Sequence, residues 1–418
     1  MTQARNMAVR LQSHARITPA IQPLPTLTDP KPYGTMLFVH SDWRSCNRVS
    51  ALMRPPRLFF MVAFLLAVIA APVAAQETVR WRDFQLCQDC PLRLTEVVRL
   101  GDAEGPGMIT LASPMVSWSE DFGYLVAALT TIQRFDSDGR FVRAMGRAGE
   151  GPGEFRAVVD AHAVEGRIVG LDALKRAWVI FDAAGDFLAE RRYGFMAGSF
   201  VPIGGNRVVV IAMDRRPSVV GNPLHLVDLD SGVPSLHFGA ASANWTIRGY
   251  GASVVGSVLG RPGTLWWATV GSPRLQEWSV EDELLTVMEG ELPWFPEVAG
   301  PTDPFTEPPP TLLQSIALDR RGHLWMALRT ADPEWRDVEL EAGPEAGAAI
   351  IPDGRSDDYR DSRLDIFDLD GRRHVGSYTW DLTGIRLMNL GGEPAIRVLE
   401  YTDDLVPQIV IYRVEWAF

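Results

Sequence analysis

Cysteine and histidine are scarce in this chain of 418 residues, which holds three cysteines and seven histidines. Cys46 precedes the main hydrophobic segment, so the rest of the chain keeps only Cys87 and Cys90, in "CQDC". Two thiols are too few for a four-thiolate zinc site. No histidine follows Cys90, which excludes covalent haem attachment. The spacing favours a structural disulfide in an exported protein, with a redox pair or free thiols as alternatives.

Basic residues are outnumbered, with 40 Lys and Arg against 52 Asp and Glu. Residues 1–57 hold 8 of the basic and 2 of the acidic residues, and residues 76–418 hold 32 and 50, a net charge of −18. A surface this acidic repels phosphate backbones, so no nucleic-acid partner is expected. The sequence also lacks a Gly-x-Ser-x-Gly nucleophile elbow and a phosphate-binding glycine loop.

Only one long hydrophobic run is present, and it is typical of a secretory signal peptide. Arg54 and Arg57 precede an uncharged stretch, residues 58–75, which ends in small residues before Gln76. We predict a signal peptide over residues 53–75 and an exported protein, in the periplasm or secreted. The alternative is an uncleaved membrane anchor, the one expected route to a membrane. Residues 1–52 are interpreted as a disordered or wrongly annotated extension, and 76–94 as a lead segment.

A repeated pattern predicts an all-β fold. An apolar strand that follows a glycine precedes two alternating strands joined by an acidic Asp-x-x-Gly-like turn. The residues before the turn are 46, 46, 51 and 89 positions apart. They are Phe135, Phe181, Val227, Trp278 and Phe367. Such spacing indicates propeller blades of four antiparallel strands, A to D from the inside outwards. Residues 278–367 are interpreted as one blade with insertions at 295–310 and 330–361, although a seventh blade there stays open.

Two similar loops explain how the ring is expected to close. "GRAGEGPGEF" (146–155) is a D-to-A loop, and "GDAEGPGMI" (101–109) follows a D strand that has no A, B and C strands before it. The last blade, after residue 380, has three strands and lacks its D strand. The N-terminal strand therefore completes the last sheet and leaves no free edge. The prediction is a six-bladed propeller over residues 95–418.

These residues resemble the six-bladed, NHL-like propellers of exported bacterial proteins. The resemblance rests on the loop "GRAGEGPGEF", the hairpins "RFDSDGRFV" and "IFDLDGRRHV", and the strand "GHLWMAL". The third and fourth blades lack the Gly-Pro-Gly loop, and Ser279 replaces the hairpin aspartate. NHL-like propellers include binding scaffolds and a minority of enzymes, so the resemblance implies the fold and does not select an activity.

The long loops all leave one face of the expected ring, where D-to-A and B-to-C connections emerge. We therefore expect a non-catalytic binding or scaffold protein that recognises a protein, peptide or glycan on this face. Cations open several C strands there, and they either form a carboxylate-binding ring or pair with loop carboxylates. Two inserted tryptophans either form a ligand platform or cover a blade edge. The candidate ligand-binding residues are Arg134, Arg176, Arg274, Arg363, Glu150, Glu154, Trp294 and Trp335.

The rival hypothesis is a metal-dependent hydrolase or lyase with its site in the central channel. Asp160 and His162 share one face of an expected inner strand, but a single histidine is a thin basis for a catalytic metal site. The Asp-x-Asp-Gly turns lack the glutamate of a calcium loop. A solvated loop is the favoured interpretation of Asp353, Asp357, Asp358 and Asp361, with weak Ca²⁺ binding as the alternative. No other metal or cofactor is expected, and catalysis is the less favoured hypothesis.

Overall fold

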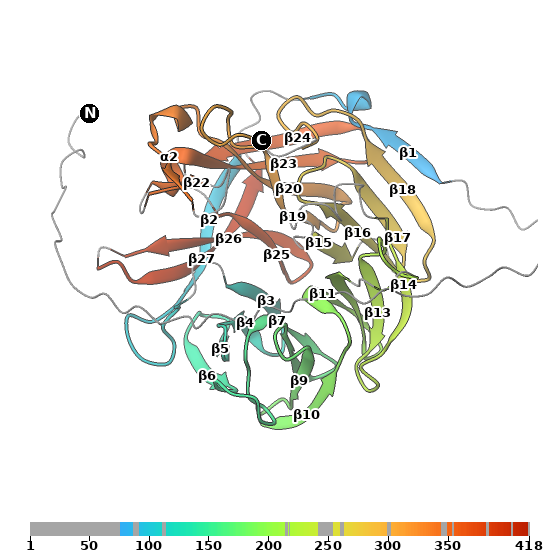
Figure 1. Cartoon of the computed structure of the whole chain (residues 1–418), viewed down its shortest axis with the longest axis vertical. Helices are drawn as coiled ribbons and strands as arrows, with labels where there is room; N and C mark the ends of the chain where they lie inside the picture. Colours follow the sequence, from blue (N-terminus) through green and yellow to red (C-terminus); the bar gives the residue numbers. More distant parts are fainter. Residues whose placement is uncertain are drawn as a thin grey trace, which may run out of the picture. The chain divides into compact units, whose positions relative to one another are not determined.

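A computed structural model describes most of the chain after the predicted signal peptide, within a compact unit formed by residues 71–418 (Figure 1). The described residues are 76–86, 92–110, 114–213, 216, 218–240, 254–259, 263–298, 302–343, 349–352, 355–381, 384–402 and 404–416. The predicted signal peptide, Cys46 and the Cys87–Cys90 pair lie outside them. Within the described part, no helix is both long and apolar enough to cross a membrane.

Six sheets of antiparallel strands form the ring, as the repeat spacing predicts. Blade 1 contains β3 (Met115–Ser119), β4 (Gly123–Ala127), β5 (Ile132–Phe135) and β6 (Phe141–Met145). Blade 2 contains β7 (Val158–Val164), β8 (Arg167–Asp172), β9 (Ala177–Phe181) and β10 (Phe187–Arg192). Blade 3 contains β11 (Met196–Gly204), β12 (Arg207–Met213), β13 (Leu224–Asp228) and β14 (Pro234–Phe238).

The second half of the ring repeats this order. Blade 4 contains β15 (Val254–Leu259), β16 (Thr264–Thr269), β17 (Leu275–Ser279) and β18 (Leu284–Glu289). Blade 5 contains β19 (Leu312–Leu318), β20 (His323–Ala331), β23 (Arg360–Asp368) and β24 (Arg373–Trp380). Blade 6 contains β25 (Arg386–Leu390), β26 (Glu393–Tyr401), β27 (Pro407–Trp416) and the N-terminal strand β2 (Leu92–Leu100).

The closure of the ring by the N-terminal strand is confirmed. β2 pairs antiparallel with β27 and brings Leu94 opposite Val414 and Leu100 opposite Ile409. Leu100 is fully buried in the core between blades 6 and 1. The pairing joins the two ends of the repeat array by backbone hydrogen bonds, so the last blade has its full four strands.

The acidic turns are hairpins, as predicted. In the β5–β6 turn, the Asp136 carboxylate accepts backbone hydrogen bonds from Asp138 at 3.0 Å and from Arg140 at 2.9 Å. A carboxylate that caps its own turn in this way explains the recurrent aspartate without a metal ion. The same bond runs from the Gly371 amide to Asp368 at 2.8 Å in the β23–β24 turn.

The loop 146–155 re-aims the chain from one blade to the next. Gly146 has a φ of +77°, and a Cβ there would lie 2.5 Å from the Phe155 ring. Phe155 is fully buried in the core between blades 1 and 2 and anchors the loop there. Gly149 and Gly153 have positive φ values, +154° and +74°, whereas Gly151 is not among the positive-φ residues and donates its N–H to Glu154 at 2.8 Å.

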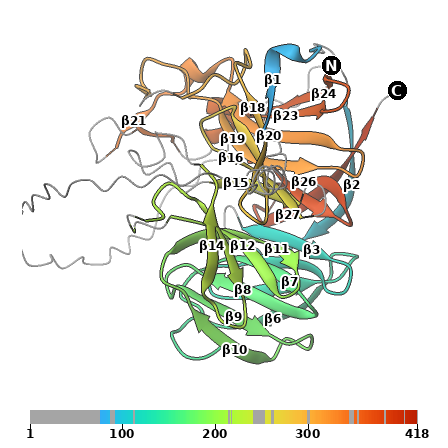
Figure 2. The same cartoon turned by 90° about the vertical axis from the view of Figure 1, so that its right-hand side faces the viewer.

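Two features of the chain go beyond the repeat. β1 (Glu77–Arg80) pairs parallel with β18 as a fifth strand of blade 4, and the two lie side by side in Figures 1 and 2. Trp81 anchors it by donating its indole N–H to the Pro273 carbonyl at 2.8 Å.

The insertion predicted at residues 330–361 is a B-to-C loop between β20 and β23. It contains η4 (Trp335–Asp337), β21 (Glu341–Ala342), β22 (Ala349–Ile350) and α2 (Ser356–Tyr359).

Candidate functional site

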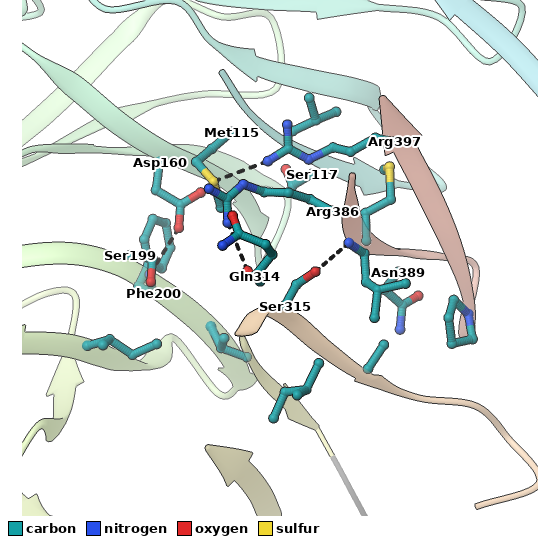
Figure 3. A pocket seen from close by; sticks show the side chains of 18 of the residues that line it. Met115, Ser117, Asp160, Ser199, Phe200, Gln314, Ser315, Arg386, Asn389 and Arg397 are labelled. Carbon is teal, nitrogen blue, oxygen red and sulfur yellow. Dashed lines mark hydrogen bonds between the residues drawn. The ribbon is translucent and has the colours of Figure 1, made fainter. Parts of the chain in front are cut away.

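The inner strands surround a cavity of about 730 Å³ in the central channel. Its walls come from β3, β7, β11, β19 and β25, together with side chains from β20 and β26 (Figure 3). Much of the lining is apolar, including Phe200, Leu312 and Met388. Polar groups are gathered at a few positions on this surface, which is the usual composition of a small-molecule site.

Three arginines line this cavity, whereas Asp160 is the one carboxylate residue among its described lining. Arg329 comes from β20, Arg386 opens β25, and Arg397 belongs to β26. In the strand register, Arg386 lies opposite Arg397, and Arg329 lies opposite Leu312, the first residue of β19. The arginines therefore lie where inner strands begin, at the end of the channel nearest the D-to-A and B-to-C loops.

The hydrogen bonds of the three arginines leave part of their donor capacity unused. Arg386 donates to the Gln314 carbonyl at 2.8 Å. Arg397 donates to the Pro114 carbonyl and to the Met115 sulfur, the latter at 3.4 Å (Figure 3). The Nε of Arg329 is buried and has no hydrogen-bond partner among the described residues. An unsatisfied buried donor is unfavourable unless a ligand or water accepts from it.

The arginines repel one another electrostatically. Burial, and then the Arg386 charge, lower the pKa of Arg397 to about 9, while Asp160 opposes this shift. Burial, and to a lesser extent the positive charge of Arg329, lower the pKa of Arg386. Burial also lowers the pKa of Arg329. The channel therefore concentrates positive charge inside a protein whose net charge is −12. An anion bound there would relieve the repulsion between the guanidinium groups.

Asp160 and His162 both line the cavity, but their geometry is that of a structural pair. The Asp160 carboxylate is buried and accepts N–H bonds from Ala161 at 2.9 Å and from Phe200 at 3.0 Å. His162 Nε2 lies 3.3 Å from Asp160, and its ring packs edge-on against Phe200 with centroids 4.8 Å apart. In the described part of the chain, the one group of three metal-ligating side chains close enough to share an ion lies elsewhere and contains neither residue.

The four predicted arginines do not line this cavity. Arg134 donates to the Phe122 carbonyl at 2.9 Å, and its guanidinium lies over the Phe122 ring. Arg176 and Arg274 are exposed. Arg363 forms a two-pronged ion pair with Asp365 on its own strand, at 2.7 and 2.9 Å.

The buried Asp365 carboxylate also carries a contact from His374 at 2.9 Å. Burial raises the pKa of Asp365, but the bonds from His374 and Arg363 outweigh it and hold the pKa below its usual value. Arg363 therefore belongs to a charge network inside blade 5.

The two predicted glutamates stabilise the loop that carries them. Glu150 pairs with Arg156 at 3.5 Å on the surface. Glu154 accepts from the Gly151 amide and from Arg147, both at 2.8 Å, and these two bonds lower its pKa. Lys175, which the sequence reasoning did not single out, packs beneath the loop and donates to the Glu154 carbonyl at 3.0 Å.

Neither predicted tryptophan forms an exposed platform. Trp335 is 7% exposed and packs with Val338 and Tyr359 inside the blade 5 insertion. Trp294 is partly buried, and its ring stacks on His374 with centroids 5.6 Å apart, while the Arg363 guanidinium lies over it at 4.4 Å. Trp294 thus packs against side chains of blade 5, and Trp335 packs within the insertion itself.

A cluster of carboxylates lies at the rim of blade 5. One oxygen from each of Asp332, Asp361 and Asp381 lies within 4.8 Å of the others. Burial, and then the charges of Asp332 and Asp381, raise the pKa of Asp361 to about 6. Of the four aspartates considered from the sequence, only Asp361 belongs to this cluster: Asp358 pairs with Arg355, and Asp353 lies outside the described residues. Asp357 contributes an unfavourable charge to Asp361 from a distance.

The chain is a six-bladed β-propeller with a cationic cavity in its central channel. Residues 127–210 match a family model described as a 6-bladed beta-propeller. No curated protein matches the sequence. A predicted exported protein from Bacteroides fragilis NCTC 9343 is similar in structure, with a TM-score of 0.53, 10% identity, and coverage of 82% of this chain and 99% of that chain.

Two further solved structures match the chain over most of its length. A member of the duf4221 family from Bacteroides vulgatus has a TM-score of 0.51 and 10% identity, over 78% of this chain and 99% of that chain. Virginiamycin B lyase from Staphylococcus aureus has a TM-score of 0.42 and 10% identity, over 77% of this chain and 99% of that chain. At such identities the similarity concerns the fold alone.

Proposed function

We propose that the protein is an exported binding propeller that holds a small carboxylate-bearing ligand, such as an acidic sugar, in its central channel. A cavity of about 730 Å³ is of a size that encloses a small molecule. The planar guanidinium of arginine matches a carboxylate by two parallel hydrogen bonds. The apolar walls would contact the body of the ligand, and the arginines would orient its acidic group.

The observation that carries the proposal is the unbalanced charge of the cavity. Three arginines face it, whereas Asp160 already accepts two backbone hydrogen bonds. The buried Nε of Arg329 lacks a partner among the described residues, although arginine donors in protein interiors are normally satisfied. A carboxylate bound between the arginines would supply both the missing acceptor and the missing negative charge.

The long-loop face stays the proposed side from which the ligand enters. The arginines lie at the beginning of inner strands, which is the end of the channel nearest these loops. The burial of Trp335 and the packing of Trp294 favour the channel mouth over a surface platform. A terminal acidic group of a glycan or peptide could reach the same arginines from this side.

Export is supported by the signal-like segment at residues 53–75 and by the predicted export of the similar Bacteroides fragilis protein. Binding is favoured over catalysis because Asp160 and His162 pair with each other and with the wall of the channel. The channel-metal hydrolase or lyase therefore has less support than an anion-binding role.

The test measures binding of glucuronate and of other sugar acids by calorimetry, with glucose as the uncharged counterpart of glucuronate. We expect saturable binding of an acid and none of glucose. Arg329→Met should weaken that binding at least ~10-fold, the effect of losing one charged hydrogen bond. Arg321→Met, at the exposed β19–β20 turn, is the matched control and should bind like the wild type. Equal binding by Arg329→Met and wild type would contradict the proposed site.

A further inference from the structure

We propose that Asp332, Asp361 and Asp381 form a binding site for a hard divalent cation, calcium above all, at the rim of blade 5. The site is separate from the channel cavity, since none of the three aspartates lines it. It therefore does not depend on the proposed function. Its expected role is to fasten the long insertion between β20 and β23 to the blade.

The cluster is built from three segments that are distant in sequence. Asp332 directly follows β20, Asp361 is the second residue of β23, and Asp381 directly follows β24. The antiparallel pairs Ala331–Arg360 and Ser362–Trp380 bring these ends together. The hydrogen-bond register of the sheet thus fixes three carboxylates at one corner of the blade.

The Asp361 side chain supplies independent evidence for a cation site. Asp361 is 7% exposed, and its Oδ1 is buried without a hydrogen-bond partner among the described residues. Asp332 is 9% exposed and uses one oxygen to accept the Glu334 amide at 2.5 Å. A buried carboxylate oxygen that lacks a donor is strongly unfavourable, the more so in a side chain that lies beside two other carboxylates. A cation between the three groups would satisfy that oxygen and neutralise their repulsion.

The donor set selects the class of ion. All three ligands are carboxylates, which hard cations such as Ca²⁺ and Mg²⁺ prefer, whereas zinc and copper sites favour nitrogen and sulfur. The ligand oxygens all lie within 4.8 Å of one another. Oxygens on opposite sides of a calcium ion are separated by about 4.8 Å, since each Ca–O distance is about 2.4 Å. Calcium also accepts irregular geometry and water ligands, which suits a site with one exposed member.

The ion would hold both ends of the inserted loop. The Asp332 amide donates to the Tyr359 carbonyl at 3.3 Å, so the loop begins and ends beside the cluster. Within the loop, Trp335, Val338 and Tyr359 form a small apolar core of their own. A cation at the base of this loop would add a cross-link between its two ends.

The experiment titrates chelator-treated protein with CaCl₂ and, separately, with MgCl₂ in a calorimeter. We expect a single calcium site with a dissociation constant of roughly 10⁻⁴–10⁻³ M, the range of extracellular calcium modules. Limited proteolysis with and without calcium then reports on the loop. Cleavage within residues 332–359 should be slower when calcium is bound.

Two variants and a control distinguish the site from general calcium adsorption on an acidic protein. Asp381→Asn alters an exposed residue and should fold normally, whereas Asp361→Asn removes the charge of the buried carboxylate. Each should weaken calcium binding at least ~10-fold, as the loss of a direct ligand does. Asp358→Asn, in α2 and paired with Arg355, should leave binding unchanged. No saturable calcium binding by the wild type, or wild-type binding by Asp381→Asn and Asp361→Asn, would overturn the proposal.

Discussion

Replacing Arg397 by methionine should stabilise the protein while removing one cation of the proposed ligand site. Arg397 is 6% exposed and lies beside Arg386 in the channel wall. Burial is the main reason why its pKa falls from 12.5 to about 9. At neutral pH the side chain is still cationic, so the folded state carries the full desolvation penalty. Methionine has a similar length and fills the same space without a charge.

The magnitude follows from the pKa. Each pKa unit corresponds to about 1.4 kcal/mol, so keeping Arg397 charged disfavours the folded state by up to ~5 kcal/mol. Methionine leaves the Pro114 carbonyl without its donor, which costs about 1–3 kcal/mol. The net expectation is a gain of about 2 kcal/mol, in line with other buried charges replaced by apolar residues. For a domain of this size that is a rise in Tm of roughly 4 °C.

Thermal unfolding of wild type, Arg397→Met and Arg413→Met provides the assay. Arg413 is an exposed arginine on the neighbouring strand β27, so its substitution should change stability by less than ~0.5 kcal/mol. The pKa of Arg397 is lower in the folded state, so its penalty is complete below pH 9 and shrinks as the pH rises from about 9 toward 12.5. The advantage of Arg397→Met should shrink over the same range. A lower Tm for Arg397→Met than for Arg413→Met would refute the reasoning.

Three further substitutions test the channel charge and the closure of the ring. Asp160→Asn removes the carboxylate that favours the charged form of Arg397. Calorimetry should therefore show tighter binding of the proposed acidic ligand, and denaturant unfolding should show a loss of about 1–3 kcal/mol. Leu100→Ala empties a fully buried position on the closing strand and should lower the free energy of unfolding by about 2–5 kcal/mol. Gly146→Ala forces a Cβ against Phe155 at a φ of +77° and should lower the free energy of unfolding by more than ~1 kcal/mol, because the conformation is incompatible with a side chain.

Sequence periodicity was sufficient to predict the ring because most contacts within a blade join residues that are close in sequence. A hairpin with a capping aspartate, such as the one at Asp136, forms from residues a few positions apart, and its spacing can be read directly. Closure could also be predicted, because a lone D strand near Leu100 and a last blade with three strands complement each other. The parallel pairing of β1 with β18 could not be predicted. β1 has only four residues and no alternating pattern, so its sequence carries no signal for a distant partner strand.

The candidate site was harder to predict because its residues meet only through the ring. Arg329 and Arg386 belong to different blades and lie on B and A strands. The cations predicted from the sequence, such as Arg363, lie on C strands. A usable signal was present: Arg397 stands within the largely apolar stretch "AIRVLEY", and arginine is seldom fully buried unless it is paired.

The expected effects of Arg397→Met and Asp160→Asn run in opposite directions for stability and for binding, and this opposition is the substance of the proposed function. A scaffold without a ligand would gain stability by losing the channel arginines, because burial and mutual repulsion lower the pKa values of Arg386 and Arg397. A bound carboxylate reverses that balance, since it satisfies the arginines and repays their desolvation. In the proposed function, binding of an anion relieves the repulsion between the arginines, and this relief contributes favourably to the free energy of binding.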